Sequence, residues 1–185
     1  MKIIGGKFRS KNFYMPHGGR TTQNVVRKAL FDTLGQDCAG MAVLDLFAGS
    51  GAVGFEAYSR GAEGVLLVEK EELPCRVIRD NLRIFGASEQ DSVNPIKLWE
   101  MDSFVAIKEL ARRKETFDLI FADPPYSRDL GKKALKHLGA YVILRPDSWV
   151  VVQHDVREKL PETEGTLKRM RFKSFGHTQL SFYHA

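Results

Sequence analysis

Apolar positions along this chain follow two periods, one typical of buried strands and one typical of amphipathic helices. Short apolar runs, such as 119–122 and 43–47, the latter with one acid at Asp45, predict strands that are covered on both faces. Elsewhere, apolar residues recur every three or four positions, as in 71–85, which predicts helices with one buried face. The pattern therefore predicts a regular succession of strands and helices.

These elements follow one another in the order of an α/β fold. Strands are expected at 43–47, 65–68, 96–99, 119–122 and 149–153, and helices at 22–34, 51–60, 71–85, 103–113 and 130–138. Alternation of this kind argues for a mostly parallel sheet with helices on both faces. Two last strands, at 167–172 and 178–183, predict an antiparallel hairpin at one edge. We expect an α/β, Rossmann-like sheet, mostly parallel with an antiparallel C-terminal hairpin.

The N-terminal part stands apart from this alternation. Residues 2–15 indicate a short strand or hairpin with a bend at Gly5 and Gly6, and the helix at 22–34 follows. A chain of 185 residues suits one domain with a full core and a small appendage. We therefore expect a basic N-terminal extension at 1–35 and a catalytic domain at 36–185.

Composition excludes several classes of protein. Cys38 and Cys75 have no metal-type spacing, and the five histidines form no ligand pattern, so no metal is expected. No apolar run is long enough to span a bilayer, and the first residues lack the apolar core of a signal peptide. We expect a monomeric cytoplasmic protein that binds neither metal nor membrane.

Charge is distributed unevenly along the chain. The net charge is +5, yet residues 1–31 carry seven Lys/Arg and no acid, and residues 165–185 carry four and no acid. Aromatic residues interleave with these terminal charges, a combination that suits phosphate contact and base stacking. A solvated surface explains the same charges equally well. The candidates for RNA contact are Lys7, Arg9, Lys11 and Arg27.

The most informative motif is Asp-Pro-Pro-Tyr at 123–126, directly after the strand expected at 119–122. Pro124 and Pro125 end that strand, because neither has an N–H for the ladder. In open α/β sheets, ligands bind at the carboxyl ends of strands. Asp123 and a neighbouring carbonyl can accept hydrogen bonds from an –NH2 group, while Tyr126 stacks on the ring that carries it. The motif predicts a holder for a nucleobase amine, with a rigid surface turn as the alternative.

A glycine-rich loop follows the first buried strand. Gly49, Gly51 and Gly54 match the dinucleotide fingerprint between a strand and a helix, and Glu69 lies 20 residues after Gly49. The fingerprint brings a pyrophosphate to a helix amino end, and the carboxylate of Asp45 would oppose that anion. S-adenosylmethionine has no phosphate and carries two cationic groups, so it suits this loop better than a nicotinamide or flavin cofactor.

Further acids fit the same cofactor, although each has a structural alternative. Glu69 would bind the ribose diol, and Asp102 is placed to accept from the adenine amine. Alternatively, Asp45 is a buried acid that caps loop amides, Glu69 is a solvated acid beside Lys70, and Asp102 is the N-cap of the helix that begins at Ser103.

These motifs together resemble the RsmD-type amino-methyltransferases. The resemblance runs from residue 2 to about residue 126 and is carried by the stretch 43–51 with Glu69, by 123–126, and by the N-terminal stretches 3–9 and 20–31. It implies methylation of the N2 amine of a guanine in 16S ribosomal RNA, with free RNA or the small ribosomal subunit as partner. The cofactor-binding residues it suggests are Asp45, Phe47, Gly49, Ser50, Gly51, Glu69, Asp102, Ser103, Arg20 and Thr22.

The chain departs from the family pattern in one segment. The family usually reads Arg-Pro-Thr where this chain has Arg20-Thr21-Thr22, and it usually has Asp and Glu at the positions of Asn24 and Lys28. By resemblance, this segment closes over the methionine end of the cofactor.

Three other functions stay open at this point. A DNA amino-methyltransferase acting on adenine or cytosine would use the same tetrapeptide, but such enzymes usually carry a target-recognition domain for which 185 residues leave no room. A NAD-dependent oxidoreductase would use the glycine fingerprint. A non-catalytic module would bind RNA without responding to a cofactor.

Overall fold

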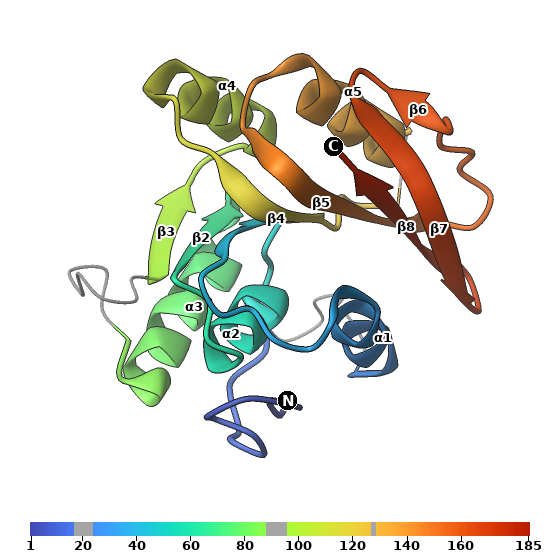
Figure 1. Cartoon of the computed structure of the whole chain (residues 1–185). Helices are drawn as coiled ribbons and strands as arrows, with labels where there is room; N and C mark the ends of the chain where they lie inside the picture. Colours follow the sequence, from blue (N-terminus) through green and yellow to red (C-terminus); the bar gives the residue numbers. More distant parts are fainter. Residues whose placement is uncertain (17–23, 88–95, 127–128) are drawn as a thin grey trace.

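The computed structural model describes residues 1–16, 24–87, 96–126 and 129–185, and its elements alternate as expected (Figure 1). The helices are α1 (Asn24–Leu34), α2 (Ala52–Ser59), α3 (Glu72–Phe85), α4 (Ser103–Arg113) and α5 (Leu130–Ala140). The strands are β1 (Ala42–Leu46), β2 (Gly64–Glu69), β3 (Ile96–Glu100), β4 (Phe117–Ala122), β5 (Leu144–Asp155), β6 (Thr163–Glu164), β7 (Leu167–Phe175) and β8 (Thr178–His184). β5 is longer than expected, and the short β6 was not expected.

The described strands form one sheet in the order β3-β2-β1-β4-β5-β8-β7-β6. The first five run parallel, and β8, β7 and β6 add an antiparallel edge. The expected α/β fold is therefore confirmed. The order of connection reverses between β1 and β4, and in open α/β sheets the crevice at such a point binds ligands.

Helices cover both faces of this sheet (Figure 1). Leu30 of α1, Phe55 of α2 and Ile78 of α3 are buried in one core cluster, whereas Ile107 of α4 and Leu135 of α5 are buried in another. We refer to these two faces as the α1–α3 side and the α4–α5 side. Among the described residues, no helix is long and apolar enough to cross a membrane.

The first residues of the chain form a loop that shares the core of the α1–α3 side. An isolated antiparallel bridge between Lys2 and Asn12 closes the loop. Ile3 and Phe13 are buried in the same cluster as the residues of α1, α2 and the sheet. The described residues of the expected N-terminal extension are thus packed directly on the sheet and its helices.

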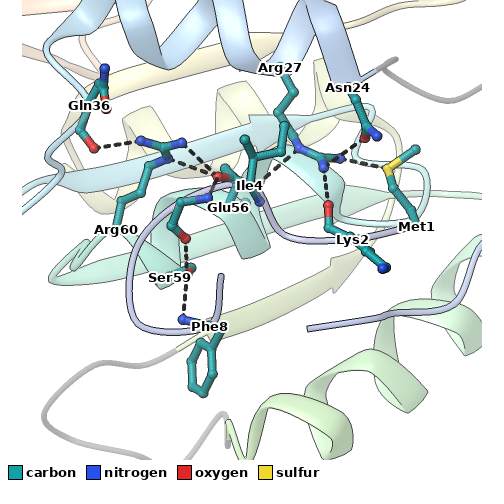
Figure 2. Close-up of polar contacts among 12 residues, drawn as sticks. Met1, Lys2, Ile4, Phe8, Asn24, Arg27, Gln36, Glu56, Ser59 and Arg60 are labelled. Atoms are coloured by element: carbon teal, nitrogen blue, oxygen red, sulfur yellow. Dashed lines mark hydrogen bonds and ion pairs between the residues drawn. The ribbon is translucent and has the colours of Figure 1, made fainter. Parts of the chain in front are cut away.

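Glu56 of α2 fixes this N-terminal loop through a buried polar cluster (Figure 2). Its carboxylate accepts hydrogen bonds from the backbone amides of Ile4 and Gly5, at 2.9 and 2.7 Å. Ion pairs with Arg27 (3.3 Å) and Arg60 (2.9 Å) balance its charge. Burying a carboxylate without such partners is strongly unfavourable. The loop, α1 and α2 are therefore joined through one side chain.

Candidate functional site

A cavity of about 680 Å³ opens at the carboxyl ends of β1, β2 and β4. Cavities of this size commonly bind small ligands and cofactors. Nine of the residues expected at the site line it: Phe47, Gly49, Glu69, Asp102, Ser103, Asp123, Pro124, Pro125 and Tyr126. Asp45, Ser50 and Gly51 are not among the lining residues. The sheet therefore gathers motifs that lie far apart in the sequence.

The glycines of the first loop have two different roles. A Cβ atom at Gly51, where φ is +76°, would lie 2.7 Å from the ring of Phe55, and one at Gly54 would lie 2.2 Å from Leu67. These two glycines thus allow α2 to pack closely on β2. A Cβ at Gly49 would meet no atom within 4 Å, and this glycine lines the cavity.

Glu69, at the end of β2, is held rigidly at the cavity wall. Its Oε2 accepts a hydrogen bond from the amide of Gly49 at 2.8 Å. Its Oε1 accepts from the amides of Lys70 and Glu71, at 2.8 and 2.9 Å. A carboxylate offers about four acceptor positions, so these three bonds fix its orientation and leave capacity for a further donor. It is a buried, hydrogen-bonded acid and not a solvated one.

Asp45 lies behind the cavity wall, in the middle of the fold. Its Oδ2 accepts a hydrogen bond from the amide of Gly54 at 2.9 Å, and the residue is buried. Burial raises the pKa of this carboxyl well above its ordinary value, the Gly54 hydrogen bond opposes that shift, and the nearby charges of Asp123 and Glu69 reinforce it. The described geometry is that of an acid capping the first turn of α2.

Asp102 combines the two roles that its position allows. Its Oδ1 accepts hydrogen bonds from the amides of Phe104 (2.9 Å) and Val105 (3.4 Å), so it is the N-cap of α4. The residue also lines the cavity. Since both capping bonds fall on Oδ1, a ligand can approach Oδ2.

The two expected serines differ in position, although both are buried. Ser50 is 5% exposed, and its carbonyl accepts a hydrogen bond from Nδ2 of Asn81 in α3 at 3.2 Å. Ser103 opens α4 and lines the cavity. Of the two, Ser103 is therefore the one that a ligand in the cavity can contact.

The cavity combines apolar walls with an excess of acids. Phe47, whose φ of +61° is uncommon for a side chain of this size, packs edge-on against Phe104 at 5.7 Å between ring centroids. Four acids line the cavity: Glu69, Glu71, Asp102 and Asp123. Only two cations line it, Lys70 and Lys133. Such a lining favours a cationic ligand with a flat apolar part. No group of three or more His, Cys, Asp or Glu in the described ranges could hold a metal ion.

Two residues that the sequence interpretation missed hold the tetrapeptide. Gln153 of β5 is 2% exposed and donates from Nε2 to Oδ2 of Asp123 at 2.9 Å. Tyr126 donates from its hydroxyl to Oγ1 of Thr178, the first residue of β8, also at 2.9 Å. Gln153 directly follows three buried valines, and a polar residue at a buried position of a strand is a signal that could have found it.

The basic residues of the N-terminal loop lie away from the cavity. The amide of Lys7 donates to the carbonyl of Ser59 at 2.7 Å, and Ser59 is the last residue of α2, whose first turn follows the glycine loop. Lys7, Arg9 and Lys11 are exposed. The ammonium of Lys7 lies 4.1 Å from the ring centroid of Tyr58. These three cations are thus at the opposite end of α2 from the cavity.

Arg27 requires a correction, because it was expected to contact RNA. Its side chain is fully buried and forms the ion pair with Glu56 at 3.3 Å (Figure 2). It also donates to the carbonyl of Lys2 and to Oδ1 of Asn24. Arg27 is therefore a structural residue in the described fold. Arg20 and Thr22, expected near the cofactor, lie outside the described residues.

Comparison with known proteins gives the family. A family model described as "Conserved hypothetical protein 95" matches residues 1–184. The chain is 30% identical over 185 residues to ribosomal RNA small subunit methyltransferase D of Escherichia coli K12, covering 99% of this chain and 89% of the relative. The chain belongs to the RsmD-type methyltransferase family.

Solved structures agree with this family fold. A hypothetical protein of Thermus thermophilus superposes with a TM-score of 0.84 at 30% identity, covering 100% of this chain and 99% of its own. The 16S rRNA N2 G1207 methyltransferase RsmC of Thermus thermophilus, in complex with AdoMet and guanosine, superposes with a TM-score of 0.68 at 21% identity. That pair covers 91% of this chain and 44% of RsmC, and its likeness shows the fold alone.

Proposed function

We propose that this protein methylates the exocyclic N2 amine of a guanine in 16S ribosomal RNA. It is an rRNA methyltransferase, as its family relatives are named, and S-adenosylmethionine is its cofactor. The position of Asp123 is the observation that carries methylation of an exocyclic amine, whereas the choice of guanine and its N2 amine rests on the resemblance to the RsmD-type family. Its carboxylate is oriented by Gln153 at the end of β4, in the same cavity as Glu69 and Asp102.

The cavity fits S-adenosylmethionine by the chemistry of its lining. Glu69 has acceptor capacity left for a ribose diol, and Oδ2 of Asp102 is accessible to an adenine amine. Phe47 and Phe104 provide an apolar wall beside Asp102. The excess of acids complements a cationic sulfur and an ammonium group. When bound, the cofactor supplies an electrophilic methyl group on a cationic sulfur.

The tetrapeptide holds the amine that attacks this methyl group. The carboxylate of Asp123 and the carbonyl of Pro124 accept hydrogen bonds from the amine, which keeps its lone pair on nitrogen and directs it. With the cofactor bound, the nitrogen would accept its methyl group while the thioether leaves with the bonding electron pair, and Asp123 would be placed to take the proton that nitrogen loses. Positioning and electrostatics are thus the contributions of the protein.

Tyr126 holds the base in place. Its ring lines the cavity, while its hydroxyl is anchored to Thr178, so the ring has a defined orientation for stacking. Base–aromatic stacking contributes roughly 1–3 kcal/mol per base. The target guanine must be unpaired or turned out of its helix to reach this ring.

Asp123→Asn tests this proposal, because it keeps the shape of the side chain and removes the charge. We expect methyl transfer to 16S rRNA to fall at least about 100-fold, equivalent to roughly 2.7 kcal/mol. The affinity for S-adenosylmethionine, measured by calorimetry, should change less than about twofold. The matched control is Asp147→Asn at an exposed position of β5. Full activity of Asp123→Asn would overturn the mechanism.

The site of methylation is tested separately by nucleoside mass spectrometry. Ribosomal RNA from cells that lack this gene is methylated in vitro by the wild-type protein and digested. We expect N2-methylguanosine as the new nucleoside. Any other methylated nucleoside would contradict the guanine N2 assignment, although the protein would still be an rRNA methyltransferase.

The N-terminal loop is a second, more distant candidate for RNA contact. Lys7, Arg9 and Lys11 are exposed and free of neighbouring acids within residues 1–31, which supports a role in binding phosphates. In this proposal, the extension at 1–35 contacts RNA beyond the target nucleotide, while the domain at 36–185 carries out the reaction.

A further inference from the structure

The C-terminal hairpin of β7 and β8 joins the catalytic tetrapeptide directly. The hydroxyl of Tyr126 donates to Oγ1 of Thr178 at 2.9 Å. Thr178 begins β8 and is paired with Phe175, the last residue of β7. The carbonyl of His177, in the turn between them, accepts from the amide of Val156 after β5. The turn of the hairpin is therefore fixed beside Tyr126, which lines the cavity, and β7 runs toward this turn (Figure 1).

Pairing with β8 decides to which side the β7 side chains point. Residues directly opposite each other in an antiparallel pair share a face. Lys173 is opposite Leu180, and Arg171 is opposite Phe182. Both partners are buried in the cluster of the α1–α3 side. Lys173 and Arg171 therefore lie on the α1–α3 side of the strand, and Arg171 is exposed there.

The two cations form a row that starts near the cavity. Two residues along a strand span roughly 6.6 Å, which sets the spacing of Lys173 and Arg171. Lys168, also exposed, continues the row after the irregular register between Arg169 and Arg171. Residues 165–185 contain no acid that could neutralise these charges within the hairpin. Arg169 is excluded from the row, because it donates to a backbone carbonyl on the other side, at 3.0 Å.

We infer that this row, Lys173, Arg171 and Lys168, binds the backbone of the ribosomal RNA that flanks the target nucleotide. The inference rests on the proposed function and adds a second substrate contact to it. Polyanionic RNA is the partner that a row of unneutralised cations fits. The row is continuous with the catalytic tetrapeptide through Tyr126 and Thr178, whereas the N-terminal cations are displaced from the cavity by the length of α2, roughly 12 Å for eight residues.

The test removes two charges from the row with Arg171→Gln and Lys173→Gln together. The matched control, Lys108→Gln with Lys136→Gln, removes two exposed charges from α4 and α5 on the other side of the sheet. Affinity for an unmodified 16S rRNA transcript is measured between about 50 and 200 mM salt. Over this range, contacts with phosphates are recognised because they make the affinity depend on salt. Melting temperature and affinity for S-adenosylmethionine are measured for each protein.

We expect the magnitude of the negative slope of log affinity against log salt to fall by about 1.4 in the row variant, since each lost single-strand phosphate contact removes about 0.7. The control should keep the wild-type slope, and the charge-preserving pair Arg171→Lys with Lys173→Arg should keep it too. An unchanged slope in a folded row variant overturns the inference.

The inference and the proposed function fail in different ways. If the wild-type protein binds the transcript through the row but produces no N2-methylguanosine, the proposed reaction is wrong and the row is still an RNA-binding surface. If the wild type methylates and the row variant binds RNA with the wild-type slope, the reaction stands and the surface is wrong. A row variant that melts at a lower temperature is replaced by the single variants, whose expected loss of slope is about 0.7 each.

Discussion

Two buried polar residues, Asp45 and Gln153, lie on the strands that flank β4, the strand that leads to Asp123. Asp45 of β1 is paired in register with Phe121, and Gln153 follows Val152, whose partner is Ala122. Gln153 donates directly to Asp123, whereas Asp45 accepts from the amide of Gly54 and so caps the first turn of α2. Each can be replaced by a side chain of similar size that lacks the property in question, the hydrogen-bond donor of Gln153 or the titrating carboxyl of Asp45.

Gln153→Leu should lower kcat with little effect on the KM for S-adenosylmethionine. A hydrogen bond to a charged acceptor contributes about 1.5–3 kcal/mol, so the expected loss in kcat is roughly 10- to 100-fold. Steady-state kinetics with 16S rRNA give both constants. Ser148→Ala is the control, because Ser148 is another buried polar residue of β5. A normal kcat in the Leu variant would show that Asp123 needs no support from β5.

Asp45→Asn should change how stability depends on pH. Burial raises the pKa of Asp45 in the folded state, so wild-type folding becomes less favourable as pH rises from the ordinary value of about 3.9 towards the raised value. Asparagine does not titrate, and its Oδ1 can still accept the Gly54 amide. The difference in melting temperature, variant minus wild type, should therefore increase as pH rises from about 4 to about 8. It should level off above the raised pKa of Asp45. A constant difference across this range would contradict the shift.

At the scale of elements, one carboxylate joins the N-terminal loop, α1 and α2. Gly6 shows how closely the loop approaches α2, since φ is +73° there and a Cβ atom would lie 1.8 Å from the carbonyl oxygen of Ser59. Glu56 then binds the adjoining amides and both arginines. The basic N-terminal sequence is therefore partly structural, and only its exposed cations are available to RNA.

Glu56→Gln should destabilise the whole fold. The change leaves the buried side chains of Arg27 and Arg60 without a charged partner, a loss that typically costs about 3–5 kcal/mol. For a domain of this size, the melting temperature should fall by roughly 6–20 °C. Glu63→Gln, at an exposed position, should shift the free energy of unfolding by less than about 0.5 kcal/mol. Equal melting temperatures for the two variants would refute a stabilising role of the cluster.

At the scale of the whole molecule, the cavity lies where β1, β2, β3 and β4 bring their following loops together, and the C-terminal hairpin reaches the same edge. The proposed cofactor residues, the Asp-Pro-Pro-Tyr tetrapeptide and the proposed RNA row come from separate stretches of the chain. A ligand that contacts several of these loops at once stabilises the folded state as a whole.

S-adenosylmethionine should therefore raise the melting temperature, and NAD should not. At a concentration 100 times its Kd, a ligand adds about 2.7 kcal/mol to the free energy of unfolding, which corresponds to roughly 5–10 °C for a domain of this size. Differential scanning fluorimetry with both ligands makes the comparison. A shift with NAD alone would favour the oxidoreductase interpretation of the glycine loop.

Much of the fold and the site could be predicted from local sequence. The predicted helices and the parallel strands are present, because apolar periodicity depends on the core that each element faces. The tetrapeptide after β4 could be located because two prolines end a strand whatever the surroundings. Gln153 and Thr178 were missed, since their partners depend on the register of β5 and β8, and Arg27 was misjudged because burial of a charge depends on its partner.

The sequence by itself determined the order of elements, the carboxyl-end position of Asp-Pro-Pro-Tyr and the acid-free basic ends, because each of these depends on residues that are adjacent in the chain. Only the tertiary structure decided which polar groups meet. It turned Asp45 to the amide of Gly54, buried Arg27 against Glu56 and set the C-terminal hairpin beside Tyr126. These outcomes follow from strand register and burial, which depend on contacts between residues distant in the sequence.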